Sequence, residues 1–185
     1  MIADFPRRRE MIRQQAEKAG RDAGGQARLD DDLLDEVTAL VEWPVALAGR
    51  FDDDFLRVPQ EALITAMEEH QKYFPVLDAN GKLTPHFITI SNIESRDPQK
   101  VIAGNEKVIA ARLSDAKFFW EQDLKRPLDA IFLAAELLME GDVGERVAEL
   151  SYLLAGACDA VPEDARRAAQ LCKADLVSGM VGEFP

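Results

Sequence analysis

Residues 69–123 read EHQKYFPVLDANGKLTPHFITISNIESRDPQKVIAGNEKVIAARLSDAKFFWEQD, and this stretch decides the fold. Its first half predicts a β-hairpin, because Tyr73–Leu77 and Phe87–Ile93 are largely apolar and flank Asp78–Gly81, whose residues tolerate positive φ. Its second half predicts one long amphipathic helix that Asp97 can cap. Apolar residues recur there at helical spacing: Val101, Ile102, Val108, Ile109, Leu113, Ala116 and Trp120.

The segments on either side extend this pattern into a mixed α+β module. Working outward, we expect helices at 6–23 and 33–41, strands at 45–51 and Phe55–Val58, and a helix opened by Pro59. Strand signals vanish from Pro127 onward, and the sequence predicts helices over Leu128–Met139, Glu145–Ala157 and Pro162–Met180. The predicted fold class is therefore α+β, with an α+β module over 1–126 and the start of an all-helical domain over 127–185.

Charge limits the partners that the chain can have. The formal net charge is −12, and residues 30–70 carry twelve acids against Arg50 and Arg57. A protein that binds nucleic acid over its whole surface is basic, so we expect no DNA partner, and any contact with RNA must be local. No signal peptide and no run of about 18 apolar residues is present, so we expect a soluble, cytoplasmic protein without membrane contact.

The chain lacks the residue patterns that carry catalysis on their own. No serine lies in a Gly-x-Ser-x-Gly elbow, and no phosphate-binding glycine loop is present. The two histidines lie far upstream of the helical half, so we expect no metal site. Cys158 and Cys172 occupy apolar helix positions without a CxxC motif, which predicts two reduced thiols in a core.

Several runs resemble one family closely. HQKYFPVLDANGKL (70–83), NIESRDP (92–98), GNEKV (104–108) and ARLSDAKFFWEQD (111–123) are similar to the β subunit of the bacterial two-subunit glycyl-tRNA synthetase. Residues 33–51 resemble the segment just upstream in that family, and 171–185 resemble a helix of its HD-type helical domain. Family members are much longer, so the chain resembles an internal fragment. Residues 129–144 depart from the family pattern.

The resemblance implies a role within a larger enzyme. It implies a part of the β subunit of glycine–tRNA ligase that supports tRNA(Gly) binding and α/β assembly. The α subunit would activate glycine, and the whole enzyme would use ATP and Mg²⁺. No cofactor is expected in this chain, and the fragment alone is not expected to be catalytic. Two alternatives stay open: a stand-alone HD-type metal phosphohydrolase and a purely structural spacer.

Ten polar residues are candidates for contact with RNA or the partner subunit: His70, Lys72, Arg96, Asn105, Lys107, Arg112, Lys117, Arg7, Arg8 and Arg9. Cations clustered on one structural unit can contact successive phosphates. Each group also has a plainer explanation. His70 and Lys72 can satisfy carbonyls at a helix C-terminus, the cations of the long helix can pair with neighbouring acids, and the three arginines can form a solvated helix face.

Overall fold

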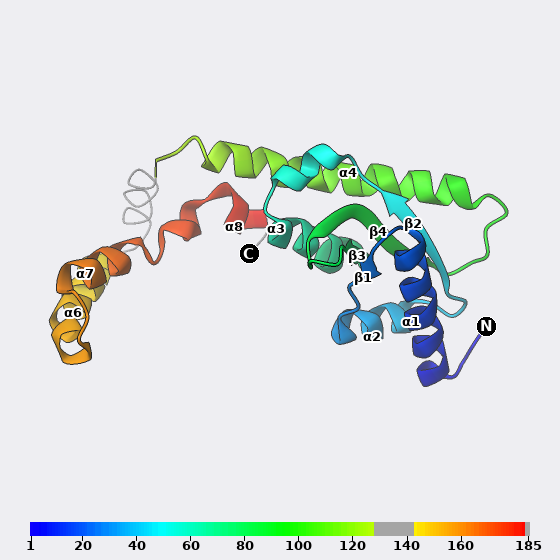
Figure 1. The fold of residues 1–185 in the computed structure, drawn as a ribbon, viewed down its shortest axis with the longest axis horizontal. Coiled ribbons are helices and arrows are strands. Elements are labelled where there is room, and N and C mark those ends of the chain that lie inside the picture. Colours follow the sequence, from blue (N-terminus) through cyan, green and yellow to red (C-terminus); the bar gives the residue numbers. More distant parts are fainter. Residues whose placement is uncertain (128–142, 184–185) are drawn as a thin grey trace. The chain divides into compact units, whose positions relative to one another are not determined.

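The computed structural model describes residues 1–127 and 143–183 and confirms the α+β class (Figure 1). The chain divides into two compact units, Met1–Lys117 and Phe118–Pro185. Each unit is described by itself below, and the domain assignment of 1–126 and 127–185 stays a prediction. Within the described ranges, no helix combines the length and the apolar character that a membrane span requires.

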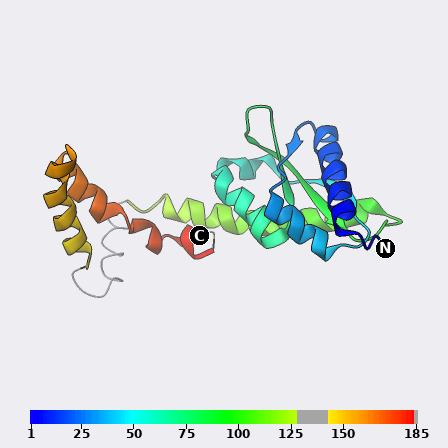
Figure 2. The same cartoon turned by 90° about the horizontal axis from the view of Figure 1, so that it is seen from below.

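The first unit is built around a four-stranded antiparallel sheet with the strand order β1-β3-β4-β2. Its strands are β1 (Gln26–Ala27), β2 (Val45–Arg50), β3 (Phe74–Leu77) and β4 (Leu83–Ser91). The predicted hairpin is confirmed as the β3–β4 pair, green in Figure 2. β4 starts at Leu83, earlier than predicted, because Leu83 pairs with Leu77 directly across the turn.

The hairpin turn is organised by one carboxylate. Asp78 Oδ1 accepts hydrogen bonds from the backbone N–H groups of Asn80 (2.8 Å) and Lys82 (2.9 Å). These two N–H donors hold the pKa of Asp78 below its ordinary value, because they stabilise the ionised carboxylate. Gly81 adopts a φ of 77°, a left-handed conformation that favours glycine. The sequence signal Asp78–Gly81 therefore acts through both a side-chain acceptor and a glycine.

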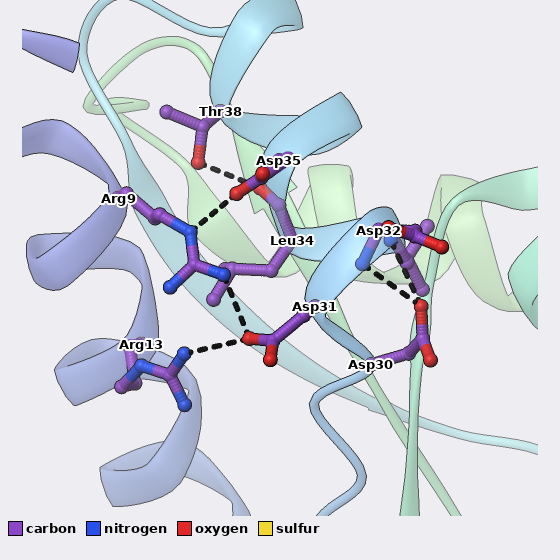
Figure 3. Close-up of polar contacts among 9 residues, drawn as sticks. Arg9, Arg13, Asp30, Asp31, Asp32, Leu34, Asp35 and Thr38 are labelled. Carbon is purple, nitrogen blue, oxygen red and sulfur yellow. Dashed lines mark hydrogen bonds and ion pairs between the residues drawn. The ribbon is translucent and has the colours of Figure 1, made fainter. Parts of the chain in front are cut away.

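Two helices cover one face of the sheet. They are α1 (Phe5–Asp22) and α2 (Asp31–Leu40), and α2 is capped by the carboxylate of Asp30 (Figure 3). Their apolar residues join those of the sheet in one core cluster: Ile12, Ala16, Leu33, Leu34, Val37, Val41, Phe74, Val76 and Ile88. Alternate residues of each strand point to this face, as the two-residue period of a strand requires.

The other face of the sheet carries a bent helical segment and the long helix. The segment is α3 (Gln60–Thr65) followed by the single π-helical turn η2 (Ala66–His70), and the long helix is α4 (Pro98–Asp123). Asp97 caps α4 as predicted, because its Oδ1 accepts the Lys100 N–H at 3.3 Å. The buried residues of these helices are Leu63, Ala66, Met67, Ile109, Leu113 and Ala116.

An aromatic side chain lies over a glycine on this second face. A Cβ added at Gly49 would come within 2.4 Å of the Phe87 ring, so only glycine fits opposite Phe87 in the β2–β4 register. The same ring stacks on Tyr73 with 4.8 Å between centroids. The Tyr73 hydroxyl donates to Asn105 Oδ1 at 2.5 Å, which ties the sheet to α4.

Side chains from two helices occupy the outer edge of β2. The Gln15 amide accepts the Ala46 N–H at 2.9 Å and donates to the Pro44 carbonyl at 3.1 Å. At the other end of the strand, Glu106 Oε1 accepts the Arg50 N–H at 2.9 Å. An open sheet edge is a template for pairing with another strand, and polar side chains that occupy its backbone groups oppose such pairing.

One predicted strand is wrong. Phe55–Val58 lies largely within the 3₁₀ helix η1 (Asp53–Arg57). Asp52 accepts the Asp54 N–H at 2.9 Å and so caps a helical turn, which the run of three aspartates makes possible.

The second unit is helical in its described part. It contains the end of α4, then α6 (Val143–Ala155), η3 (Gly156–Cys158), α7 (Pro162–Leu171), η4 (Ala174–Val177) and α8 (Gly179–Glu183). Arg166 joins α7 to α6, since it lies 2.9 Å from the Glu149 carboxylate and 4.0 Å from the centroid of the Tyr152 ring.

Two predictions for this unit are wrong, and one lies outside the described residues. The helix predicted over Pro162–Met180 is interrupted, because Ser178 takes an extended conformation and caps Val181 N. Cys158 and Cys172 are exposed rather than buried, since they lie in η3 and at the C-cap of α7. The helix predicted over Leu128–Met139 falls on residues that are not described.

Candidate nucleic-acid interface

The three consecutive arginines of α1 lie in three different environments. Arg7 is exposed, whereas Arg8 is only 8% exposed. Arg8 donates from Nε to the Thr38 carbonyl at 3.0 Å, and from one terminal nitrogen to the carbonyls of Ile2 (2.6 Å) and Ala3 (3.2 Å). The Arg8 guanidinium therefore holds the C-terminal part of α2 against α1 and is turned away from solvent.

Arg9 is engaged with the acidic start of α2 (Figure 3). Its guanidinium pairs with Asp35 and lies 2.7 Å from Asp31 Oδ1, which also accepts from Arg13 at 3.0 Å. The hydrogen bonds from Arg9 and then Arg13 hold the pKa of Asp31 below its ordinary value. Only Arg7 of the three arginines thus presents an exposed guanidinium.

Lys72 lines an acidic cleft, and His70 precedes it by two residues. His70 is the last residue of η2, and Lys72 follows with a φ of 58°, an uncommon conformation for a residue with a side chain. This backbone conformation accompanies a Lys72 Nζ contact of 2.9 Å with Glu36 Oε2. The cleft is lined by Arg28, Asp30, Asp32, Leu33, Glu36, Glu68, Glu69 and Lys72. Its acids outnumber its cations, which disfavours a phosphate backbone there.

Glu68 is the partly buried acid of this cleft. Burial raises the pKa of Glu68, and the adjacent Arg28 guanidinium, which pairs with it, opposes that rise. Arg28 is therefore already paired with Glu68 within the protein.

The candidates on and beside α4 separate into two groups. Asn105 is half-buried and bonded at both ends of its amide, to the Tyr73 hydroxyl and to the Val101 carbonyl (2.8 Å). Lys117 Nζ lies 2.8 Å from Asp54 Oδ2, and this bond is the main reason that the pKa of Asp54 lies below its ordinary value. Both residues tie α4 to the rest of the first unit.

The other group faces solvent. Arg96, Lys107 and Arg112 are exposed, and none of them forms an ion pair with another residue in the described part of the chain. Lys107 and Arg112 lie about 7.5 Å apart along the helix axis, from the 1.5 Å rise per residue. Of the ten candidates, these three and Arg7 are the cations that the structure leaves for an external anion.

The burial of Arg8 had a signal in the sequence. Arg8, Ile12, Ala16 and Gly20 follow one another at steps of four, and all four are buried in α1. Residues four apart share a helix face, so this spacing places Arg8 on the apolar ridge rather than among the solvated arginines.

The described residues include no group of three or more His, Cys, Asp or Glu side chains with the geometry to hold a metal ion. The exposed cations Arg7, Arg96, Lys107 and Arg112 can bind an external anion.

Residues 1–185 match the family model described as glycyl-tRNA synthetase beta subunit, and the chain belongs to that family. It is 50% identical over 192 residues to the glycine–tRNA ligase beta subunit of Azotobacter vinelandii, and 53% identical to that of Marinobacter nauticus. The chain is covered completely in both cases but spans only 28% of these relatives' length.

Proposed function

We propose that this chain is part of the β subunit of a cytoplasmic glycine–tRNA ligase, where it supports tRNA(Gly) binding and assembly with the α subunit. The whole enzyme attaches glycine to tRNA(Gly) with ATP and Mg²⁺, and this segment has no catalytic role of its own. Membership in the beta subunit family and the names of the relatives support this proposal.

The observation that carries tRNA contact is the pair of exposed cations on α4. Lys107 projects from the side of α4 opposite the buried residues Ile109 and Leu113, and the exposed Arg112 lies on the flank of that buried stripe. A helix anchored in this way presents its cations without first having to be ordered. Cations on such a surface bind phosphates and release counterions, which makes the affinity salt-dependent.

The surrounding charge limits the area of this contact. The chain carries a net charge of −12, so a large RNA footprint would be repelled. Glu106, which precedes Lys107, is turned to the Arg50 N–H and so is engaged on the protein side. Arg96 lies just before α4 and can add a third phosphate contact.

The test compares two double variants that remove the same charge. Lys107→Gln with Arg112→Gln should weaken binding of tRNA(Gly), whereas Lys18→Gln with Lys82→Gln should leave it unchanged. Lys18 and Lys82 are also exposed, on α1 and after the hairpin turn. Filter binding between about 50 and 200 mM salt should show the salt slope falling by about 0.7–0.9 for each lost contact.

Equal effects of the two double variants would show that only the net charge matters and would overturn the α4 interface. A wild-type chain that fails to bind tRNA(Gly) at about 50 mM salt would support a structural spacer instead.

A further inference from the structure

Three large apolar side chains of the first unit are exposed at the end of α2 and in two neighbouring loops. Leu40 is 63% exposed at the end of α2, Trp43 is 45% exposed in the loop before β2, and Ile93 is 66% exposed in the loop after β4. Grouped exposed apolar side chains are a mark of a protein interaction site, unlike apolar residues scattered singly over a surface.

The two loops are joined by the side chain of Asn92. Its Oδ1 accepts the backbone N–H groups of Glu42 at 2.7 Å and Trp43 at 2.9 Å. The adjacent strands continue this link, since Val45 of β2 pairs with Ser91 of β4. Ile93 directly follows Asn92, and the side chain of Asn92 is bonded to the backbone of Trp43. This bond brings the loop of Ile93 next to the loop of Trp43.

The backbone of residues 38–43, which carries Leu40 and Trp43, is held by two further hydrogen bonds. Arg8 Nε donates to the Thr38 carbonyl at 3.0 Å, and the Ile2 N–H donates to the Glu42 carbonyl at 2.9 Å. The chain between Thr38 and Trp43 is thus held on both sides. A surface that is ordered before binding loses less entropy when a partner docks.

We propose that Leu40, Trp43 and Ile93 form a docking surface, the Trp43 patch, for the α subunit of the same ligase. This inference rests on the proposed function, which supplies the α subunit as partner. Trp is enriched among the residues that dominate binding energy, and the aliphatic neighbours of Trp43 are typical of an interface centre.

The charges around the patch favour a protein with a basic rim. Glu42 and Glu94 are exposed and flank Trp43 and Ile93 directly, whereas Asp31, Asp35 and Glu36 of α2 are paired with Arg9, Arg13 and Lys72. RNA phosphates placed over Trp43 and Ile93 would be repelled by Glu42 and Glu94. A second copy of the chain would bring the same acids and the same net charge of −12. An α-subunit surface that is apolar at its centre and rich in Lys or Arg at its edge fits these constraints.

The test measures binding of purified α subunit to the full chain. Trp43→Ser with Ile93→Ser should weaken that binding by about 30-fold, the change expected when a dominant interface residue is truncated. Leu56→Ser is the matched control, because Leu56 is also an exposed apolar residue of the first unit (36%) and should leave binding unchanged. Thermal unfolding of each variant checks that the fold is retained.

The remaining outcomes all count against the Trp43 patch. Equal affinity of wild type and the double variant overturns it, as does a wild-type chain that does not bind the α subunit. Self-association of the wild type that the double variant abolishes would assign the patch to a second copy. Weakened tRNA(Gly) binding by the double variant would assign it to RNA. The α4 interface has its own readout, the salt slope of tRNA binding, so the two proposals can fail separately.

Discussion

Replacing Arg8 with Met tests whether this arginine is structural. Methionine keeps most of the aliphatic stem and removes three hydrogen bonds to carbonyls, of which the one to Thr38 is buried. A hydrogen bond from a charged group contributes about 1.5–3 kcal/mol, and a buried carbonyl left without a donor costs about 1–3 kcal/mol. Relief of the desolvation of the guanidinium offsets part of this loss.

We therefore expect Arg8→Met to lower the free energy of unfolding by about 2–3 kcal/mol, measured by urea denaturation. Arg7→Met is the matched control, because Arg7 is the exposed neighbour, and it should change stability by less than about 0.5 kcal/mol. If Arg8→Met were as stable as wild type and bound tRNA(Gly) more weakly, Arg8 would be an RNA contact and its structural role would be refuted.

Two further predictions concern the first unit. Gly49→Ala should lower the melting temperature, since the added Cβ would lie 2.4 Å from the Phe87 ring and overpacking costs about 1–3 kcal/mol. Gly104→Ala should raise the melting temperature, because nothing lies within 4 Å of a Cβ added at Gly104 and alanine favours a helix. A higher melting temperature for Gly49→Ala than for Gly104→Ala would contradict this packing. Asp78→Asn should be less stable than wild type at neutral pH, with the difference shrinking in acid. The folded-state pKa of Asp78 is lowered from 3.8, so its contribution is complete above that value and is lost as pH falls through the folded pKa. A difference that stays constant in urea denaturation down to about pH 2 would argue against the carboxylate's role.

Local chemistry made much of the first unit predictable. The hairpin follows from a turn in which Asp78 and Gly81 each have a specific conformational task, and the start of α4 follows from Asp97. The side chains of Asp78 and Asp97 bond to backbone groups only a few residues away, so these elements can be predicted without knowing which distant residues they contact.

The parts that sequence did not predict depend on contacts between distant residues. Arg8 reaches Thr38, thirty residues away, and the Lys72 ammonium reaches Glu36. The packing of α1 on α2, and of η2 beside α2, determines which cations are bonded within the protein rather than left exposed to solvent. The spacing of Arg8 with Ile12 and Ala16 carries a signal for its burial, but this spacing does not reveal which carbonyls accept its hydrogen bonds.

The second unit shows a different limit. Periodicity predicts α6 and α7, but the separation of η4 from α8 depends on Ser178, which is extended and whose hydroxyl accepts the Val181 N–H in an otherwise helical pattern. Cys158 and Cys172 were misplaced because apolar spacing alone does not show which face of a short helix meets a partner.

The outer border of β2 has a consequence for how the first unit assembles. Gln15 and Glu106 come from helices that precede and follow this strand by dozens of residues. Before both helices have docked, the outer edge of β2 can pair with another extended chain. After they have docked, Gln15 and Glu106 occupy backbone N–H groups of this edge, and no fifth strand is needed to do so. The packing of α1 and α4 on the sheet is thus also what protects this edge from pairing with another chain.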